Sequence, residues 1–309
     1  MRVVILRALK LGDFLTAVPA YRAIRRAFPN DRIVLAAPRA LAPLAALLGG
    51  AIDDVADTRE LAPLPPDASD ADVGINLHGR GPQSHRLLLQ ARAGSLIAFR
   101  HPDVAESAGG PEHDPDEHEV ERWCRLLRAH GIAADPQELD LPAPRIVIPR
   151  RLRGATLLHP GASSVARRWP VERWIEVARA EHRLGRRAII TGDASELPAA
   201  RAIADAASVP PTHVYAGRTN VCELAALVAA SSRVVCGDTG IAHLATAYRR
   251  PSVVLFGPVA PSRWGPPPRP YHRVLWSGTT GDPHADRVDP GLLAIPAARV
   301  IAELDALPA

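Results

Sequence analysis

The sequence predicts an α/β protein with two parallel-sheet domains joined by a proline-rich linker. Strands and helices alternate along the chain, and most strands are continuous apolar runs such as residues 2–6, as expected for a sheet covered on both faces. Residues 135–153 carry four prolines and no helical period, and the alternation restarts after them. With 309 residues the chain can form two hydrophobic cores. We therefore expect domains at 1–145 and 146–309, with a last helix, about 296–304, able to pack back on the first domain.

Each expected element follows from local sequence. Strands are short β-branched or apolar runs, and helices are apolar at every third or fourth position, with glycine or proline at their ends. The expected strands are 2–6, 32–36, 53–56, 72–77, 96–99, 156–159, 187–191, 213–215, 233–236 and 252–256. The expected helices are 14–26, 38–48, 84–91, 117–130, 171–184, 198–206, 221–230, 241–248 and 296–304. Because ligands bind at the carboxyl ends of parallel strands, we expect a site in a central cleft that both domains face.

Composition excludes several function classes. The formal charge is +4, Lys10 is the only lysine, and no basic run is interleaved with aromatic residues, so we expect no binding to nucleic acid. Three isolated cysteines argue against a disulfide framework and against a zinc site. A strand begins at residue 2 and no apolar run approaches about 20 residues, so we expect a cytoplasmic protein. Its positive charge would suit an anionic substrate, or peripheral contact with the inner membrane from the cytoplasmic face. We expect a monomer.

A turn between a strand and a helix forms the first candidate site. The strand 233–236 runs through small residues into a helix, so free backbone N–H groups and the positive end of the helix dipole point at one place. Such a place binds anions. Two side chains could cap the helix and one could reach back to a phosphate; the candidate residues are Asp238, Thr239, Gly240 and His243. The alternative is an ordinary capped helix with a core histidine.

A second turn follows the strand 156–159. Its small residues, Ser163 among them, allow a ligand close to the backbone, and Arg167 and Arg168 can neutralise phosphate through planar guanidinium groups. The alternative is a solvated basic loop. Nearby Trp169 is expected to pack in the core rather than to recognise a ligand.

A third turn follows the first strand and contains Lys10, Gly12 and Asp13, with Thr16 after it. Gly12 would let the chain turn. Asp13 could simply cap the following helix, or its carboxylate could accept a proton from an attacking hydroxyl. Both interpretations stay open at this point.

Two further patterns carry no site. The acids and histidines of residues 112–121 do not match a known metal-ligand spacing, and acids before a helix favour its dipole. No strand is followed by GxGxxG, which disfavours a dinucleotide oxidoreductase. We therefore expect neither a metal nor a cofactor.

Taken together, the motifs resemble glycosyltransferase family 9, the lipopolysaccharide heptosyltransferases. The resemblance covers essentially the whole chain. It rests on Gly12-Asp13-x-Leu15-Thr16-x-x-Pro19, on His159-Pro-Gly-Ala-Ser163 followed by Arg167-Arg168-Trp169-Pro170-x-Glu172-x-Trp174, on Cys236-Gly-Asp-Thr-Gly-Ile-Ala-His-Leu-Ala245 with Pro251 and Phe256-Gly-Pro258, and on His118-Glu-Val-Glu-Arg122.

The resemblance implies a GT-B fold, with two Rossmann-like domains that bind the acceptor on the N-terminal side and a nucleotide-sugar on the C-terminal side. It implies an inverting, metal-independent transfer of heptose from ADP-heptose to a lipid-linked oligosaccharide, with Asp13 as the base. Residues matching the family's donor site are Asp238, Thr239, Gly240, His243, Arg167 and, in a looser alignment, Glu196. Lys10, Gly12, Thr16, His78 and Arg80 fall on the acceptor side.

The sequence departs from the family in two places. Arg167 stands where relatives usually have lysine, and His78-Gly79-Arg80 stands where relatives often have a glutamine-containing acceptor loop. Donor and acceptor therefore stay open. A UDP- or GDP-sugar transferase, a nucleotide-sugar epimerase of the same shape and a non-catalytic binder are the alternatives.

Overall fold

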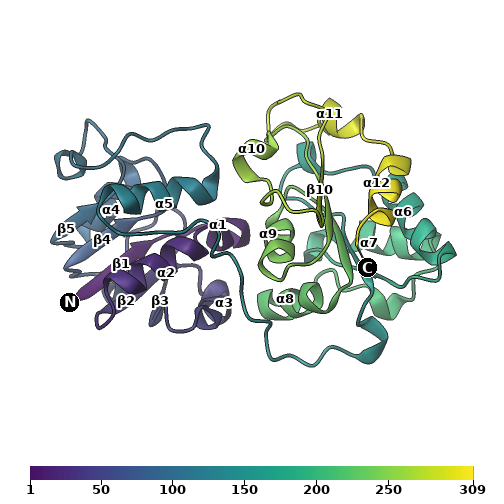
Figure 1. Cartoon of the computed structure of the whole chain (residues 1–309), viewed down its shortest axis with the longest axis horizontal. Helices are drawn as coiled ribbons and strands as arrows, with labels where there is room; N and C mark the ends of the chain where they lie inside the picture. The colour runs from purple at the N-terminus through teal and green to yellow at the C-terminus, as the bar shows by residue number, and fades with distance from the viewer. Residues whose placement is uncertain (309) are drawn as a thin grey trace. The chain divides into compact units, whose positions relative to one another are not determined.

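The computed structural model describes residues 1–308, which form two compact units, the first Met1–Pro142 and the second beginning at Ala143 (Figure 1). The boundary lies inside the proline-rich segment. Each unit contains one sheet of five strands, and every strand pair in both sheets is parallel. None of the helices in the described part of the chain is long and apolar enough to cross a membrane.

The N-terminal sheet has the strand order β3-β2-β1-β4-β5. Valine, isoleucine and leucine fill its central strands, and their side chains are buried on both faces, as parallel sheets require. Helices α2 and α5 lie side by side (Figure 1). The strands are β1 Arg2–Leu6, β2 Arg32–Ala37, β3 Asp54–Asp57, β4 Val73–Asn76 and β5 Ser95–Ile97. The α-helices are α1 Leu11–Thr16, α2 Val18–Ala27, α3 Ala42–Ala45, α4 Gln83–Gln90 and α5 Glu119–Ala129.

Two helices expected in this unit are divided. The helix expected at 14–26 starts earlier, at Leu11, and is interrupted at Ala17, after which Pro19 lies in the first turn of α2. Proline is tolerated there because first-turn N–H groups have no helical partner. The helix expected at 38–48 is a run of short 3-10 and α segments around Pro43, and it ends at Gly49, whose φ is +64°.

The C-terminal sheet has the order β10-β9-β8-β6-β7. Its strands are β6 Thr156–His159, β7 Ala188–Ile190, β8 Arg233–Gly237, β9 Ser252–Leu255 and β10 His272–Leu275. Its α-helices are α6 Val171–Arg183, α7 Leu197–Ala206, α8 Val221–Ala230, α9 Gly240–Ala247, α10 Pro261–Trp264, α11 Pro290–Leu293 and α12 Ala297–Asp305. Trp169 and Trp174 are buried with their rings edge to face at 5.3 Å, so the expected packing role of Trp169 is confirmed.

Two expectations for this unit are wrong. The strand expected at 213–215 is only a single bridge, Val214 to Ile190. The edge strand β10 lies inside residues 257–290, where no strand was expected. The last helix, α12, packs against α6 and β9 of its own unit, and Val300 and Leu304 belong to that unit's core.

Each sheet contains a point where the chain changes direction of travel across the sheet. In the N-terminal sheet, β1 is flanked by β2 on one side and β4 on the other. The loops that follow β1 and β4 therefore leave two neighbouring strands in opposite directions across the sheet. In the C-terminal sheet the same holds for β6 and β8. Ligands of open parallel sheets bind at such switch points.

Candidate functional site

Residues from three loops of the C-terminal unit come together at the carboxyl ends of adjacent strands. Ser163 and Arg167 follow β6, Glu196 follows β7, and Asp238 follows β8. We call these residues, with Thr239, Gly240 and His243, the C-terminal loop cluster.

An ion pair joins two of these loops across the switch point. Arg167 Nη1 lies 3.4 Å from Asp238 Oδ2, and the two side chains are 26% and 10% exposed. Burial raises the pKa of the Asp238 carboxyl, and the Arg167 guanidinium opposes that rise. Arg168 instead donates from Nε to the carbonyl of Ala162 in its own loop, 3.0 Å away. The structure therefore turns Arg167, and not Arg168, toward the loop after β8.

Helix α9 begins beside this pair. Thr239 is its N-cap residue, but neither Thr239 nor Asp238 caps it with a side chain, so the expected capping is wrong. Asp238 faces Arg167 instead, and Thr239 Oγ1 is buried without a hydrogen-bond partner. Neither Gly237 nor Gly240 has a positive φ, so the turn does not need glycine for its backbone angles. Unsatisfied N–H groups at such a helix start attract anions.

His243 lies in the second half of the first turn of α9 and is half-buried. Its ring meets the Trp264 ring edge to face, with centroids 6.1 Å apart. His243 is therefore not a core histidine.

Glu196 is held against the loop after β6. Its Oε2 accepts the N–H of Asp193 at 2.8 Å, within a capping box that starts the short helix before α7. A Cβ added to Gly161 would lie only 1.9 Å from Glu196 Oε2, so the carboxylate fits over that glycine. Burial raises the pKa of Glu196.

The N-terminal candidates gather at the other switch point. Asp13 is in the first turn of α1, whereas the N-cap residue is Lys10, so Asp13 is not the helix cap. Gly12 also lies within α1 and does not form the preceding turn. Thr16 is fully buried and donates to the carbonyl of Asp13 at 3.0 Å. Burial raises the pKa of the Asp13 carboxyl above its ordinary value, against the opposing effect of Arg7.

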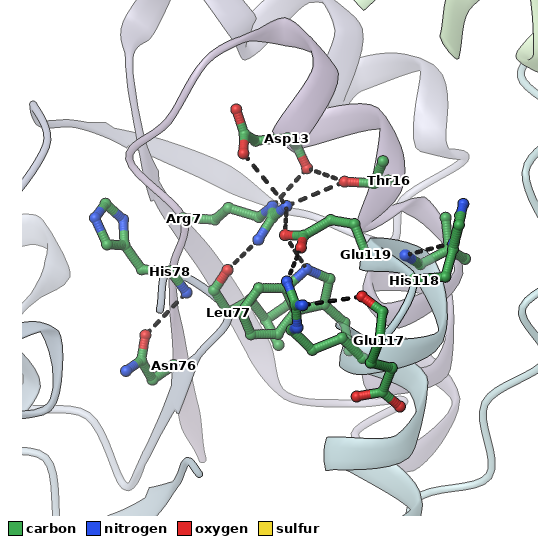
Figure 2. A network of polar contacts seen from close by, with 12 residues as sticks. Arg7, Asp13, Thr16, Asn76, Leu77, His78, Glu117, His118 and Glu119 are labelled. Atoms are coloured by element: carbon green, nitrogen blue, oxygen red, sulfur yellow. Dashed lines mark hydrogen bonds and ion pairs between the residues drawn. The ribbon is translucent and has the colours of Figure 1, made fainter. Parts of the chain in front are cut away.

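Arg7, directly after β1, is the centre of this group (Figure 2). Its side chain is fully buried and donates to the carbonyls of Asp13 and Leu77, and to Thr16 Oγ1 at 3.1 Å and Glu119 Oε1 at 3.1 Å. The guanidinium lies 3.9 Å from Asp13 Oδ1. One buried cation thus connects the loops after β1 and β4 with helices α1 and α5.

His78, which follows β4, lies beside the residues that surround Arg7 (Figure 2). Its Nδ1 accepts the N–H of Ala8 at 3.2 Å, so the neutral ring carries its proton on Nε2. Burial, aided by Arg7, lowers the pKa of His78 to about 4. Lys10 and Arg80 are exposed.

Comparisons with known proteins decide the family. A sequence profile of glycosyltransferase family 9 (heptosyltransferase) matches residues 111–290, more than half of the chain. The chain belongs to glycosyltransferase family 9. Lipopolysaccharide heptosyltransferase 2 of Escherichia coli (strain K12) is 29% identical over 213 residues, which is 61% of each sequence. The match thus spans less than two thirds of that curated relative.

Solved structures with the same fold cover nearly the whole chain. E. coli ADP-heptose lps heptosyltransferase II superposes with a TM-score of 0.77 at 21% identity, covering 99% of this chain and 98% of the other. E. coli heptosyltransferase WaaC with ADP-2-deoxy-2-fluoro heptose gives 0.71 at 19% identity and covers 99% of both. The predicted two-domain α/β fold of the GT-B type is confirmed.

For this family member, sequence reasoning missed Arg7 and underrated Glu119. The sequence pattern gives Arg7 no role, and it gives Glu119 only that of an acid that favours a helix dipole. The available signal is an arginine directly after the buried apolar residues Val3 to Leu6, because a buried cation must be paired.

The acidic segment at 112–121 is explained by arginine partners. Its ion pairs are Glu112–Arg100, Glu117–Arg125, Glu119–Arg7, Glu119–Arg122 and Glu121–Arg128. Among residues 1–308, no group of three or more histidine, cysteine, aspartate or glutamate side chains is arranged to hold a metal ion.

Proposed function

We propose that the chain is an inverting, metal-independent glycosyltransferase that moves a heptose from ADP-heptose to a lipopolysaccharide-type acceptor. Family membership supports the reaction class. One structural relative is an ADP-heptose lps heptosyltransferase, and another is a heptosyltransferase with ADP-2-deoxy-2-fluoro heptose, which supports an ADP-linked donor. A lipid-linked acceptor would bring the enzyme to the cytoplasmic face of the inner membrane.

The observation that carries this proposal is the Arg167–Asp238 pair beside the start of α9. When the bond between the sugar and the diphosphate breaks, negative charge grows on the diphosphate. The free N–H groups of α9, the Thr239 hydroxyl and the Arg167 fork are donors that can take up this charge without a metal. Asp238 keeps the guanidinium in place and is itself positioned to accept a hydroxyl of the donor.

The sugar acceptor is deprotonated by Asp13 in this proposal. Its carboxylate takes the proton of the attacking hydroxyl as the new bond to the anomeric carbon forms on the face opposite the leaving diphosphate, which inverts the configuration. The neutral Nε2–H of His78 can donate to an acceptor oxygen. Lys10 and Arg80 offer exposed positive charges to an anionic acceptor.

Glu196 would accept the ribose hydroxyls of the donor. Gly161→Ala tests this role, because the added methyl would displace the carboxylate from its place over residue 161. We expect ADP affinity to fall about tenfold, the effect of losing one charged hydrogen bond, as measured by calorimetry. Gly109→Ala is the control, because a Cβ there meets nothing within 4 Å. Unchanged ADP affinity in Gly161→Ala would remove Glu196 from the donor site.

Calorimetric binding of ADP, UDP and GDP in EDTA tests the donor. We expect ADP to bind more tightly than UDP and GDP, and binding to persist without a divalent ion. A preference for UDP or GDP would keep the transferase and discard the ADP-linked donor. No binding of any of the three would overturn the proposal.

A turnover assay tests the acceptor. ADP release from ADP-heptose is followed with lipopolysaccharide whose core lacks heptose, with lipopolysaccharide whose core ends in one heptose, and with no acceptor. Release only with one of the two acceptors identifies the sugar that is extended. Conversion of ADP-heptose to an isomer without acceptor would instead indicate an epimerase.

A further inference from the structure

We propose that Glu119 is a positioning residue for Asp13, acting through Arg7. This inference rests on the proposed role of Asp13 as the base. Glu119 belongs to α5, more than a hundred residues further along the chain than Asp13, yet one guanidinium connects the two carboxylates (Figure 2).

Arg7 fixes the backbone that carries Asp13. Its Nε donates to the Asp13 carbonyl and its Nη1 to the Leu77 carbonyl, while Nη2 donates to Thr16 Oγ1. Among the contacts of Arg7, only the longer one, 3.9 Å to Oδ1, reaches the Asp13 carboxylate itself. Arg7 therefore positions Asp13 mainly through its main chain, while backbone groups of Lys10 and Asp13 also help to lower the pKa of the carboxyl.

Glu119 holds Arg7 in turn. Its Oε1 accepts from Arg7 Nη2 at 3.1 Å and from Trp123 Nε1 at 2.9 Å, and its Oε2 accepts from Arg122. The Trp123 ring lies under the guanidinium, 4.7 Å from centroid to Arg7 Cζ. All of these side chains are less than a tenth exposed, so their charges are poorly screened by water.

The charges of the group balance. Arg7 and Arg122 are positive, and Glu119 and Asp13 are negative. Burial alone would raise the pKa of Glu119, but Arg7 and Arg122 outweigh it and hold that pKa below its ordinary value. Two other titratable groups near Asp13 are neutral in the assay range: burial raises the pKa of Tyr21 on α2, and His78 has a pKa of about 4. Lys10 is exposed to solvent.

Removing Glu119 and removing Arg7 should shift the acid limb of the pH profile of kcat/KM in opposite directions. Glu119→Gln leaves Arg7 with Asp13 as its nearest carboxylate, which favours ionised Asp13, so the acid limb of kcat/KM should move down by roughly one pH unit. Arg7→Met removes the stabilising cation and leaves Glu119 facing Asp13, so the limb should move up by roughly one unit. In both variants kcat falls, and ADP affinity, measured by calorimetry, stays unchanged.

Two more variants separate charge from geometry. In the double variant Arg7→Met with Glu119→Gln the opposing shifts cancel, so the limb should return near its wild-type position while kcat stays low. Arg7→Lys retains the charge without the planar fork, so the limb should stay in place while kcat falls.

The control is Glu181→Gln in the C-terminal unit. Glu181 is equally buried and pairs with Arg186, far from any proposed role, and this variant should leave the pH profile unchanged. The inference would be overturned if the acid limb of kcat/KM shifted in the same direction in Glu119→Gln and Arg7→Met, or did not shift in either. This outcome counts only for variants whose melting curves match that of the wild type. If Asp13 is not the base, the result is a different one, because Asp13→Asn would then retain turnover.

Discussion

Asp13→Asn should lower kcat by roughly 10²–10⁴-fold, the usual contribution of a general base. Asparagine has nearly the same shape and retains the backbone carbonyl that accepts from Arg7, so the group around Arg7 should persist. ADP affinity should not change, because every residue proposed to bind the donor belongs to the C-terminal unit. Turnover of ADP-heptose with the acceptor identified above is compared with calorimetric ADP binding in the same preparation.

The matched control for this substitution is Asp53→Asn. Asp53 is also an aspartate of the N-terminal unit with an arginine partner, Arg25, at 2.5 Å, but it lies at the β3 side of the sheet. Its turnover should equal that of the wild type. If Asp13→Asn kept kcat within about threefold of wild type, far less than a base contributes, the base would have to be another group.

The second large effect is expected at the leaving group. Arg167→Ala should weaken ADP binding by about 10–100-fold, the loss of a hydrogen bond between charged groups. It also leaves the Asp238 carboxylate largely buried without its cation, so the pKa of Asp238, already raised by burial, should rise further. Calorimetry at two pH values measures both effects.

Two variants make this result interpretable. Arg167→Lys keeps the charge but loses the second parallel hydrogen bond, so its ADP affinity should fall between those of wild type and alanine. Arg179→Ala removes an exposed arginine of α6 that donates to the Ala206 carbonyl, and it should bind ADP as the wild type does. Full ADP affinity in Arg167→Ala would contradict the proposed diphosphate contact.

The central strands could be predicted from sequence because burial on both faces demands continuous apolar residues. Residues 3–6 and 234–236 have that composition, and both lie in strands of the structure. β10 could not be predicted in this way. It is an edge strand in which His272 and Leu275 are buried while Val274 is exposed, and its conformation depends on pairing with β9.

The candidate site could be predicted where one short segment supplies several of its residues. Asp238, Thr239 and Gly240 lie together because the backbone between β8 and α9 is short. The Arg7–Glu119 pair joins residues 112 positions apart, and nothing local to either residue indicates the other. The Arg167–Asp238 pair is similar, since choosing Arg167 over Arg168 depends on how the loop after β6 folds back.

The position of the only lysine has a practical consequence. Lys10 is exposed and precedes α1, three residues before Asp13. A fluorophore that reacts with lysine side chains would therefore attach at one predictable side chain beside the proposed base. The chain thus carries a built-in attachment point for an optical reporter of acceptor arrival, with no cysteine engineering required.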